Sequence, residues 1–201
     1  FREFSLLLDM MCVRYAFDAI QQLSVENSFT LDDLRRQLPE AQHPLLTKLT
    51  PMLENNDLLV VSDGLATLQD PSDFPEAISI WEHIVQQSPE YLPEVLLLSQ
   101  CGEALPKVLS GELDSDKLLR ADKSSLFEQM LEVGPNYRSF NQALSNAVLT
   151  SVANWPSTQR CRILLIASYP AQISYALLDA LDNGQTDLVI ASDNAANLSS
   201  T

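Results

Sequence analysis

The stretch Arg162-Ile163-Leu164-Leu165-Ile166-Ala167 decides the fold class of this chain. It is a short and continuous apolar run, which is the pattern of a parallel β-strand that is buried on both faces. A helical pattern over residues 171–181 follows it, and Asp187-Leu188-Val189-Ile190-Ala191 repeats the apolar run. A strand, a helix and a strand at this spacing predict a right-handed βαβ unit. The tail is therefore expected to begin a doubly wound sheet, but it holds too few strands to complete one.

The residues before this tail are predicted to be mainly helical. Thr30 is expected to cap a helix that stops before Pro39. Another helix is expected to end at Gly102, because glycine is common just past a helix terminus. The segment 58–68 predicts a hairpin around Ser62-Asp63-Gly64. The expected helices cover residues 4–23, 30–38, 44–55, 76–87, 94–102, 105–109, 118–132 and 137–152.

The helices and the hairpin of residues 1–70 follow one another in the order of a small winged helix. A winged helix that binds duplex DNA needs basic side chains, yet residues 31–57 carry three basic side chains against five acidic ones. The whole chain has 12 Lys and Arg against 27 Asp and Glu, which gives a net charge of −15. This acidity argues against nucleic acid and anionic membrane as partners, because their phosphates would be repelled.

The three cysteines, Cys12, Cys101 and Cys161, lie far apart and show no zinc-binding spacing. This usage indicates a reducing, cytoplasmic location, and Cys101 and Cys161 are expected to be buried. No apolar run reaches the roughly 18 residues that a membrane span requires. His43 is interpreted as a residue that caps a helix or faces solvent, and His83 as a surface residue, so no metal site is predicted. The sequence does not begin with methionine, so it is interpreted as a piece of a longer polypeptide.

Three blocks of sequence carry a family resemblance. They are residues 93–114 (PEVLLLSQCGEALPKVLSGELD), residues 126–141 (LFEQM through NYRSFN), and the two apolar runs at 162–166 and 187–192. In this order they resemble the segment before the catalytic core, the following helix-turn-helix, and the first and fourth strands of the C-methyltransferase region of modular polyketide synthases. The resemblance spans about residues 93–193, and the N-terminal helices resemble the lid of that family.

The resemblance implies a cofactor turn directly after the first strand. In active members of the family this turn reads acid-x-Gly-x-Gly-x-Gly, because S-adenosylmethionine lies against bare backbone there. Here the turn reads Ala167, Ser168, Tyr169, Pro170 and Ala171, with no glycine and no carboxylate. The turn is therefore interpreted as degenerate, and Tyr169 and Pro170 would obstruct the cofactor.

Two further departures from the family affect the rest of the expected site. Only about five residues connect the helix at 171–181 to the strand at 187, so the family's second strand, with its ribose-binding carboxylate, and its third strand are absent. The family's Asn-x-x-His motif is reduced here to Asn194 and Asn197, with no histidine after them. Asparagine cannot act as a general base. No catalytic residue, cofactor-binding residue or metal ligand is therefore predicted.

The predicted fold is mainly α with a small α/β part. It consists of a winged-helix-like lobe over residues 1–70, a helical lid and linker region over 71–158, and a truncated Rossmann-like methyltransferase remnant over 159–201. The resemblance, with its departures, implies a non-catalytic pseudo-methyltransferase that acts as a scaffold domain of a polyketide synthase multienzyme and takes no cofactor. Its expected partners are the neighbouring domains of the same synthase.

Other interpretations stay open on the sequence. The main alternative is an S-adenosylmethionine-dependent C-methyltransferase that acts on a carrier-bound β-ketoacyl thioester and has part of its core missing from this chain. A third interpretation is an independent winged-helix dimerisation module. An acyl carrier protein is a further candidate partner, because Arg160 and Arg162 lie in the least acidic stretch of the chain, although two such arginines also suit a solvated strand end.

Overall fold

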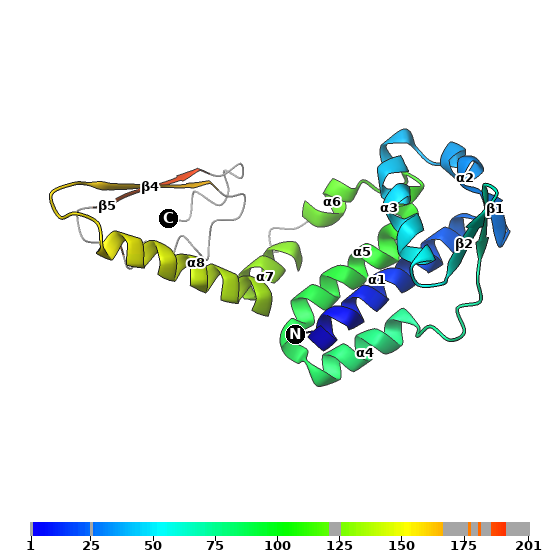
Figure 1. Ribbon diagram of the computed structural model, residues 1–201, viewed down its shortest axis with the longest axis horizontal. Coiled ribbons are helices and arrows are strands. Elements are labelled where there is room, and N and C mark those ends of the chain that lie inside the picture. The colour runs from blue at the N-terminus through cyan, green and yellow to red at the C-terminus, as the bar shows by residue number, and fades with distance from the viewer. Residues whose placement is uncertain are drawn as a thin grey trace. The chain divides into compact units, whose positions relative to one another are not determined.

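The computed structural model describes residues 2–24, 26–120, 126–166, 177, 181 and 186–191. Most of these residues are helical, and short strands form two small sheets (Figure 1). The mainly helical fold that the sequence predicts is therefore confirmed. The chain divides into two compact units, Phe1–Phe127 and Glu128–Thr201, and each is described by itself. The expected division of the chain at residues 70 and 158 stays a prediction.

Helices dominate the first unit. They are α1 (Arg2–Leu23), α2 (Leu31–Gln37), α3 (His43–Glu54), α4 (Ala77–Gln87), α5 (Leu92–Leu109) and α6 (Ser115–Arg120), with the 3-10 turns η1 (Glu40–Gln42) and η2 (Pro89–Tyr91). α2 begins after Thr30, whose hydroxyl oxygen accepts a hydrogen bond from the backbone N–H of Asp33 at 3.1 Å. This bond satisfies an N–H group that a helix leaves unpaired at its start. The predicted cap is therefore confirmed.

The predicted hairpin is also confirmed. β2 (Leu59–Ser62) and β3 (Leu65–Leu68) pair antiparallel. Between them, Asp63 has a φ of 52° and Gly64 a φ of 81°, which are the two positive values that a tight two-residue hairpin turn needs. β1 (Ser28–Thr30) pairs with the other edge of β3, so the strand order is β1-β3-β2. The sequence analysis did not predict β1, because a strand of three residues has too short a pattern.

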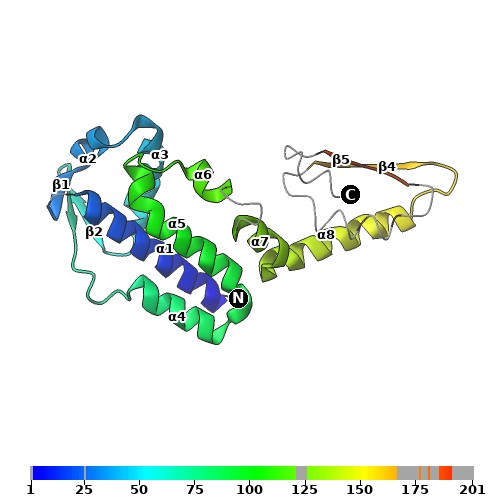
Figure 2. The same cartoon turned by 180° about the vertical axis from the view of Figure 1, so that it is seen from behind.

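α1 is buried on more than one face. Phe17 and Ile20 belong to a core with α2, α3 and the hairpin, whereas Phe4 and Met11 belong to a second core with α4 and α5. Figures 1 and 2 show α1 lying between α4 and α5. Apolar residues recur every three or four positions along α1, as on one face of a helix, but fully buried Phe17 lies outside that face. A helix that is apolar around most of its circumference is a central helix of its unit.

The predicted helix end at Gly102 is wrong. α5 runs without interruption from Leu92 to Leu109, so the separate helix expected at 105–109 is its last part. Position 102 lies inside α5, and it is a glycine because a Cβ atom there would overlap the ring of Tyr15 on α1. The helix instead ends at Leu109 with Ser110 as its C-cap, and Gly111, with a φ of 79°, supplies the left-handed residue that follows.

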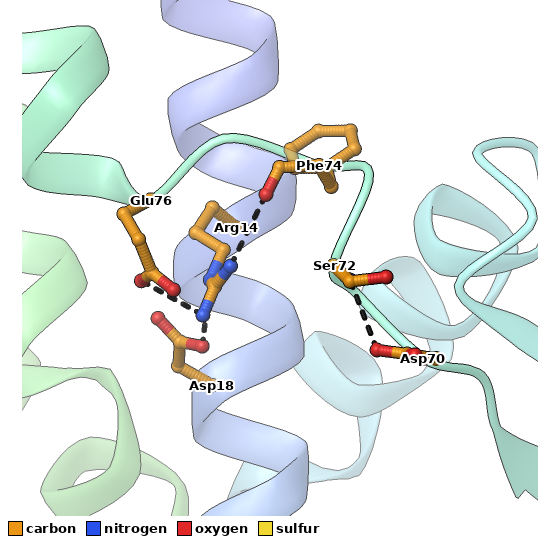
Figure 3. A network of polar contacts seen from close by, with 6 residues as sticks. All are labelled: Arg14, Asp18, Asp70, Ser72, Phe74 and Glu76. Atoms are coloured by element: carbon orange, nitrogen blue, oxygen red, sulfur yellow. Dashed lines mark hydrogen bonds and ion pairs between the residues drawn. The ribbon is translucent and has the colours of Figure 1, made fainter.

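A buried arginine on α1 fixes the segment that leads into α4 (Figure 3). Arg14, only 8% exposed, pairs with Asp18 at 2.9 Å and with Glu76 at 2.8 Å. It also donates a hydrogen bond to the carbonyl oxygen of Phe74 at 3.4 Å. Its three contacts satisfy a buried cation that would otherwise be costly. Residues 71–75 form the linker between the hairpin and α4, and these contacts tie the linker down at its C-terminal end.

The second unit contains most of α7 (Leu126–Val133), together with α8 (Pro135–Ala153), β4 (Cys161–Ile166) and β5 (Thr186–Ala191). β4 and β5 pair parallel, as predicted. α8 begins at Pro135, two residues before the predicted start, because proline suits the first position of a helix. Of the helix expected over 171–181, only Leu177 and Leu181 are described, and both are buried. Of the helix expected over 118–132, residues 121–125 lie outside the described residues.

None of the described helices is both long enough and apolar enough to cross a lipid bilayer.

Gly102→Ala tests the close approach of α1 and α5. The added methyl group overlaps the Tyr15 ring, and overpacking costs about 1–3 kcal/mol, against a gain of about 1 kcal/mol in helix propensity. We expect a net loss of about 1 kcal/mol in the free energy of unfolding, measured with urea. In a Tyr15→Ala background the same substitution should be neutral or stabilising. An equal loss in both backgrounds would contradict this account.

Arg14→Met tests the charged contacts of the linker. Methionine keeps the apolar stem but loses the guanidinium, and its partners Asp18 and Glu76 have side chains 40% and 63% exposed, so water can solvate them after the change. We therefore expect a loss of only about 1–2 kcal/mol in the free energy of unfolding. Arg14→Lys should lose less, because it keeps the charge. Unchanged stability of Arg14→Met would show that the pairs contribute nothing.

Candidate functional site

The carboxyl ends of β4 and β5 form the candidate site. Ligands of open parallel sheets bind beyond this edge, at the point where the strand order reverses. In the doubly wound order 3-2-1-4-5-6 the first and fourth strands are neighbours, as β4 and β5 are here. The register pairs Ile166 with Ala191 at the edge, and Ile166 is 75% exposed. The described part of the edge therefore ends in two apolar side chains.

The residues predicted to form the degenerate turn lie beyond the described part of this edge. Ala167, Ser168, Tyr169, Pro170 and Ala171 follow β4 directly, and all of them are outside the described residues. The same holds for Asn194 and Asn197, which come after β5. Their interpretation as remnants of a cofactor site stays a prediction.

The charged side chains of the strand pair gather at the opposite edge. Arg160 donates to Asp187 at 2.8 Å, and Arg162 lies 3.9 Å from the same carboxylate. The register explains this pairing, because Arg162 lies directly opposite Asp187. Asp187 neutralises part of the positive charge that the sequence places at this strand start. Both arginine side chains are more than half exposed, which suits a solvated strand end.

The described residues of β4 and β5 do not fit S-adenosylmethionine. Its amino and ribose groups call for acceptors at the carboxyl edge, where Ile166 and Ala191 stand. Within the two strands as described, the one carboxylate is Asp187, which lies at the far edge and already pairs with Arg160. The described part of the carboxyl edge therefore carries no polar side chain.

A groove of about 430 Å³ lies in the second unit between α8 and β4. Trp155, which is 45% exposed, stands at one side of it, and Cys161 and Arg162 stand at the start of β4. Most of the other lining side chains are apolar. Among the described residues that line it, none is a histidine or a carboxylate.

The histidines and cysteines have structural environments. His43 Nε2 lies 2.9 Å from the carbonyl oxygen of Arg35, at the end of α2. Its ring therefore contacts the end of α2 and does not cap the start of α3, where the sequence places it. His83 is exposed, as predicted. Burial raises the pKa of the Cys12 and Cys101 thiols, and the Asp9 carboxylate adds to the shift at Cys12. Cys161 is buried, as predicted, whereas Cys101, for which the same was expected, is only partly buried. Thiols with raised pKa values are poor nucleophiles.

Metal-ligating side chains do not cluster in the described ranges, where no group of three or more His, Cys, Asp or Glu is placed to hold an ion.

The first unit contains a buried carboxylate that the sequence analysis missed. Glu94, in the first turn of α5, is 8% exposed. Neither of its oxygens has a hydrogen-bonding partner in the part of the chain that the structure describes. Burial raises the pKa of Glu94. In the sequence, the signal for this burial is the position of Glu94 directly before the apolar run Val95-Leu96-Leu97-Leu98.

Glu94→Gln tests this burial. The raised pKa means that folded Glu94 holds its proton more tightly than unfolded Glu94, so its contribution to stability is complete below the unfolded pKa and is lost as pH rises through the folded pKa. Glutamine removes the charge, so the variant should be more stable by about 1 kcal/mol at pH 7. Its advantage should shrink as the solution is acidified. Urea unfolding at several pH values measures both effects.

The control for this experiment is Glu90→Gln, which changes an exposed carboxylate in the neighbouring turn η2. Its stability should follow that of the parent chain at every pH. A Glu94→Gln variant that is no more stable than the parent at pH 7 would contradict the account of Glu94.

Comparison with known proteins bears on the family of the chain. No protein-family model matches it. The curated non-reducing polyketide synthase dpfgA of Gibberella zeae is 24% identical over 143 residues, which cover 68% of this chain and 7% of that synthase. This chain therefore spans a small part of that relative.

Solved structures share the fold of this chain. The CurJ carbon methyltransferase has a TM-score of 0.82 and 20% identity, covering 98% of this chain and 55% of that one. The CMeT domain of the citrinin polyketide synthase has a TM-score of 0.79 and 14% identity, covering 96% and 54%. This chain thus spans about half the length of these structures. The resemblance expected from the sequence is confirmed: the chain is similar to the C-methyltransferase regions of polyketide synthases and shares their fold over the part that it covers.

Proposed function

We propose that this chain is a non-catalytic pseudo-methyltransferase region that serves as a scaffold within a polyketide synthase. The carboxyl edge of β4 and β5 carries the proposal, because its described residues, Ile166 and Ala191, supply no polar side chain where the cofactor of this fold would lie. The sequence that follows β4 supports it, since residues 167–171 contain neither glycine nor carboxylate. Packing needs only an apolar pattern, so a fold can persist after its chemistry is lost.

The expected partners of this scaffold are the neighbouring domains of the same synthase. Similarity to a multidomain polyketide synthase supports this expectation. An acyl carrier protein is the further candidate, and Arg160 and Arg162 would be its contacts, although both lie near Asp187. The net charge of −15 disfavours nucleic acid and anionic membrane.

The arrangement proposed for residues 1–70 is that of a winged helix. The order α1, β1, α2, α3, β2, β3 and the sheet order β1-β3-β2 support it. In this proposal residues 71–158 form the helical lid and linker, and residues 159–201 form the Rossmann-like remnant.

A working C-methyltransferase that acts on a carrier-bound β-ketoacyl thioester is the second candidate. Its support is the shared fold, which extends over 98% of this chain in the comparison with the CurJ carbon methyltransferase. In this case the parent polypeptide would carry a further strand with an acidic end between Leu181 and Thr186. The coding sequence across that junction distinguishes the two candidates.

Calorimetric titration with S-adenosylmethionine tests the scaffold proposal. The sample is the full polypeptide that carries this chain, so that an incomplete core is not the cause of a negative result. We expect no binding heat, because the turn at residues 167–171 lacks glycine and carboxylate. A catalytically active carbon methyltransferase domain in the same buffer serves as the positive control. Micromolar binding at this region would contradict the proposal and favour the second candidate.

A further inference from the structure

A second groove lies in the first unit, between α1, α4 and α5, and has a volume of about 480 Å³. We call it the α1–α4–α5 groove. It belongs entirely to the helical unit, so it is separate from the carboxyl edge of β4 and β5 and does not depend on the proposed function. Its principal lining residues are Tyr15, Glu76, Ile78, Trp81, Leu96 and Glu103.

The walls of this groove combine aromatic and aliphatic surface. Trp81 packs against the second core with part of its ring surface still exposed, and Leu96 on α5 is similarly half-buried. Ile78, in the first turn of α4, is 61% exposed. An exposed isoleucine beside a half-exposed tryptophan leaves apolar area that a partner can cover.

The charge in the groove is negative and incompletely neutralised. Burial raises the pKa of Tyr15, a hydrogen bond with Ser99 lowers it, and the carboxylates of Glu103 and Asp18 raise it further, so Glu103 acts on this groove. Arg14 is already paired with Asp18 and Glu76. In the described ranges no cation forms an ion pair with Glu103, and none of the lining residues is basic.

We propose that the α1–α4–α5 groove binds an arginine side chain that a partner protein presents on an apolar and basic segment. A planar guanidinium stacks on aromatic rings and donates hydrogen bonds to carboxylates, and the groove is lined by one group of each kind, Trp81 and Glu103. An apolar residue beside that arginine covers Ile78. Charge complementarity selects this occupant, because residues 1–100 carry 5 basic against 16 acidic side chains.

Trp81 supplies the readout for the test. The chain has two tryptophans, so Trp155→Phe leaves Trp81 as the one emitter. The probe is a short synthetic peptide that alternates leucine and arginine, and two peptides of equal length carry lysine or glutamate in place of arginine. We expect a saturable change in Trp81 emission with the arginine peptide, weaker binding of the lysine peptide, and no binding of the glutamate peptide.

Variants in the same Trp155→Phe background locate the binding site. Glu103→Gln and Ile78→Ser change exposed side chains, so the fold should be kept, which circular dichroism checks. Glu103→Gln should bind the arginine peptide about tenfold more weakly, because this variant loses a charged hydrogen bond. Glu112→Gln is the matched control, because it removes the same charge from an exposed position just beyond α5 that does not line the groove.

The proposal is overturned if Glu103→Gln binds the arginine peptide as tightly as the parent. It is also overturned if Glu112→Gln weakens binding equally, since attraction would then follow total charge alone. Binding of the glutamate peptide, or an unchanged Trp81 emission with the arginine peptide, would overturn it as well.

Discussion

The guanidinium of Arg14 ties the residues before α4 to α1, the helix that contributes to both cores. It stands on α1 between residues of the first core, such as Val13, and residues of the second core, such as Met11. By binding Phe74 O and Glu76 it holds the residues immediately before α4. The position of α4 in turn sets one wall of the second core. A single buried cation, satisfied by two partly exposed carboxylates, thus determines how the chain passes from the hairpin into the second half of its unit.

The elements predicted correctly from the sequence are those specified by local signals. The Thr30 cap, the Asp63-Gly64 turn and the apolar runs of β4 and β5 depend on residues within one short segment. The role of Gly102 was misinterpreted because the group that requires a glycine there is the Tyr15 ring, which lies 87 positions away in sequence. Phe17 was missed for a related reason, since a second buried face on α1 arises only when other helices pack around it.

The same distinction between local signals and tertiary contacts applies to the candidate site. The sequence predicted two parallel strands and the residue types that follow them, because strand and turn composition are local properties. It did not predict that Asp187 would face Arg162, because the pairing follows from the register between strands 25 positions apart. Nor did it single out Glu94, whose lack of partners is a property of the folded surroundings. Side-chain charges are visible in a sequence, but their compensation depends on tertiary contacts.

The distribution of charge differs between the strand pair and the helical unit. The β4 and β5 pair keeps its apolar pattern and presents Leu164, Ile166 and Val189 largely exposed, whereas its charged groups are confined to the amino edge. Methyl transfer needs particular groups at the other edge, and packing does not. The helical unit, by contrast, holds most of the negative charge of the chain. Long-range attraction between proteins depends on their net charges, and close contact depends on the complementarity of their surfaces. An acidic helical surface can therefore select a partner independently of the residues at the carboxyl edge of β4 and β5.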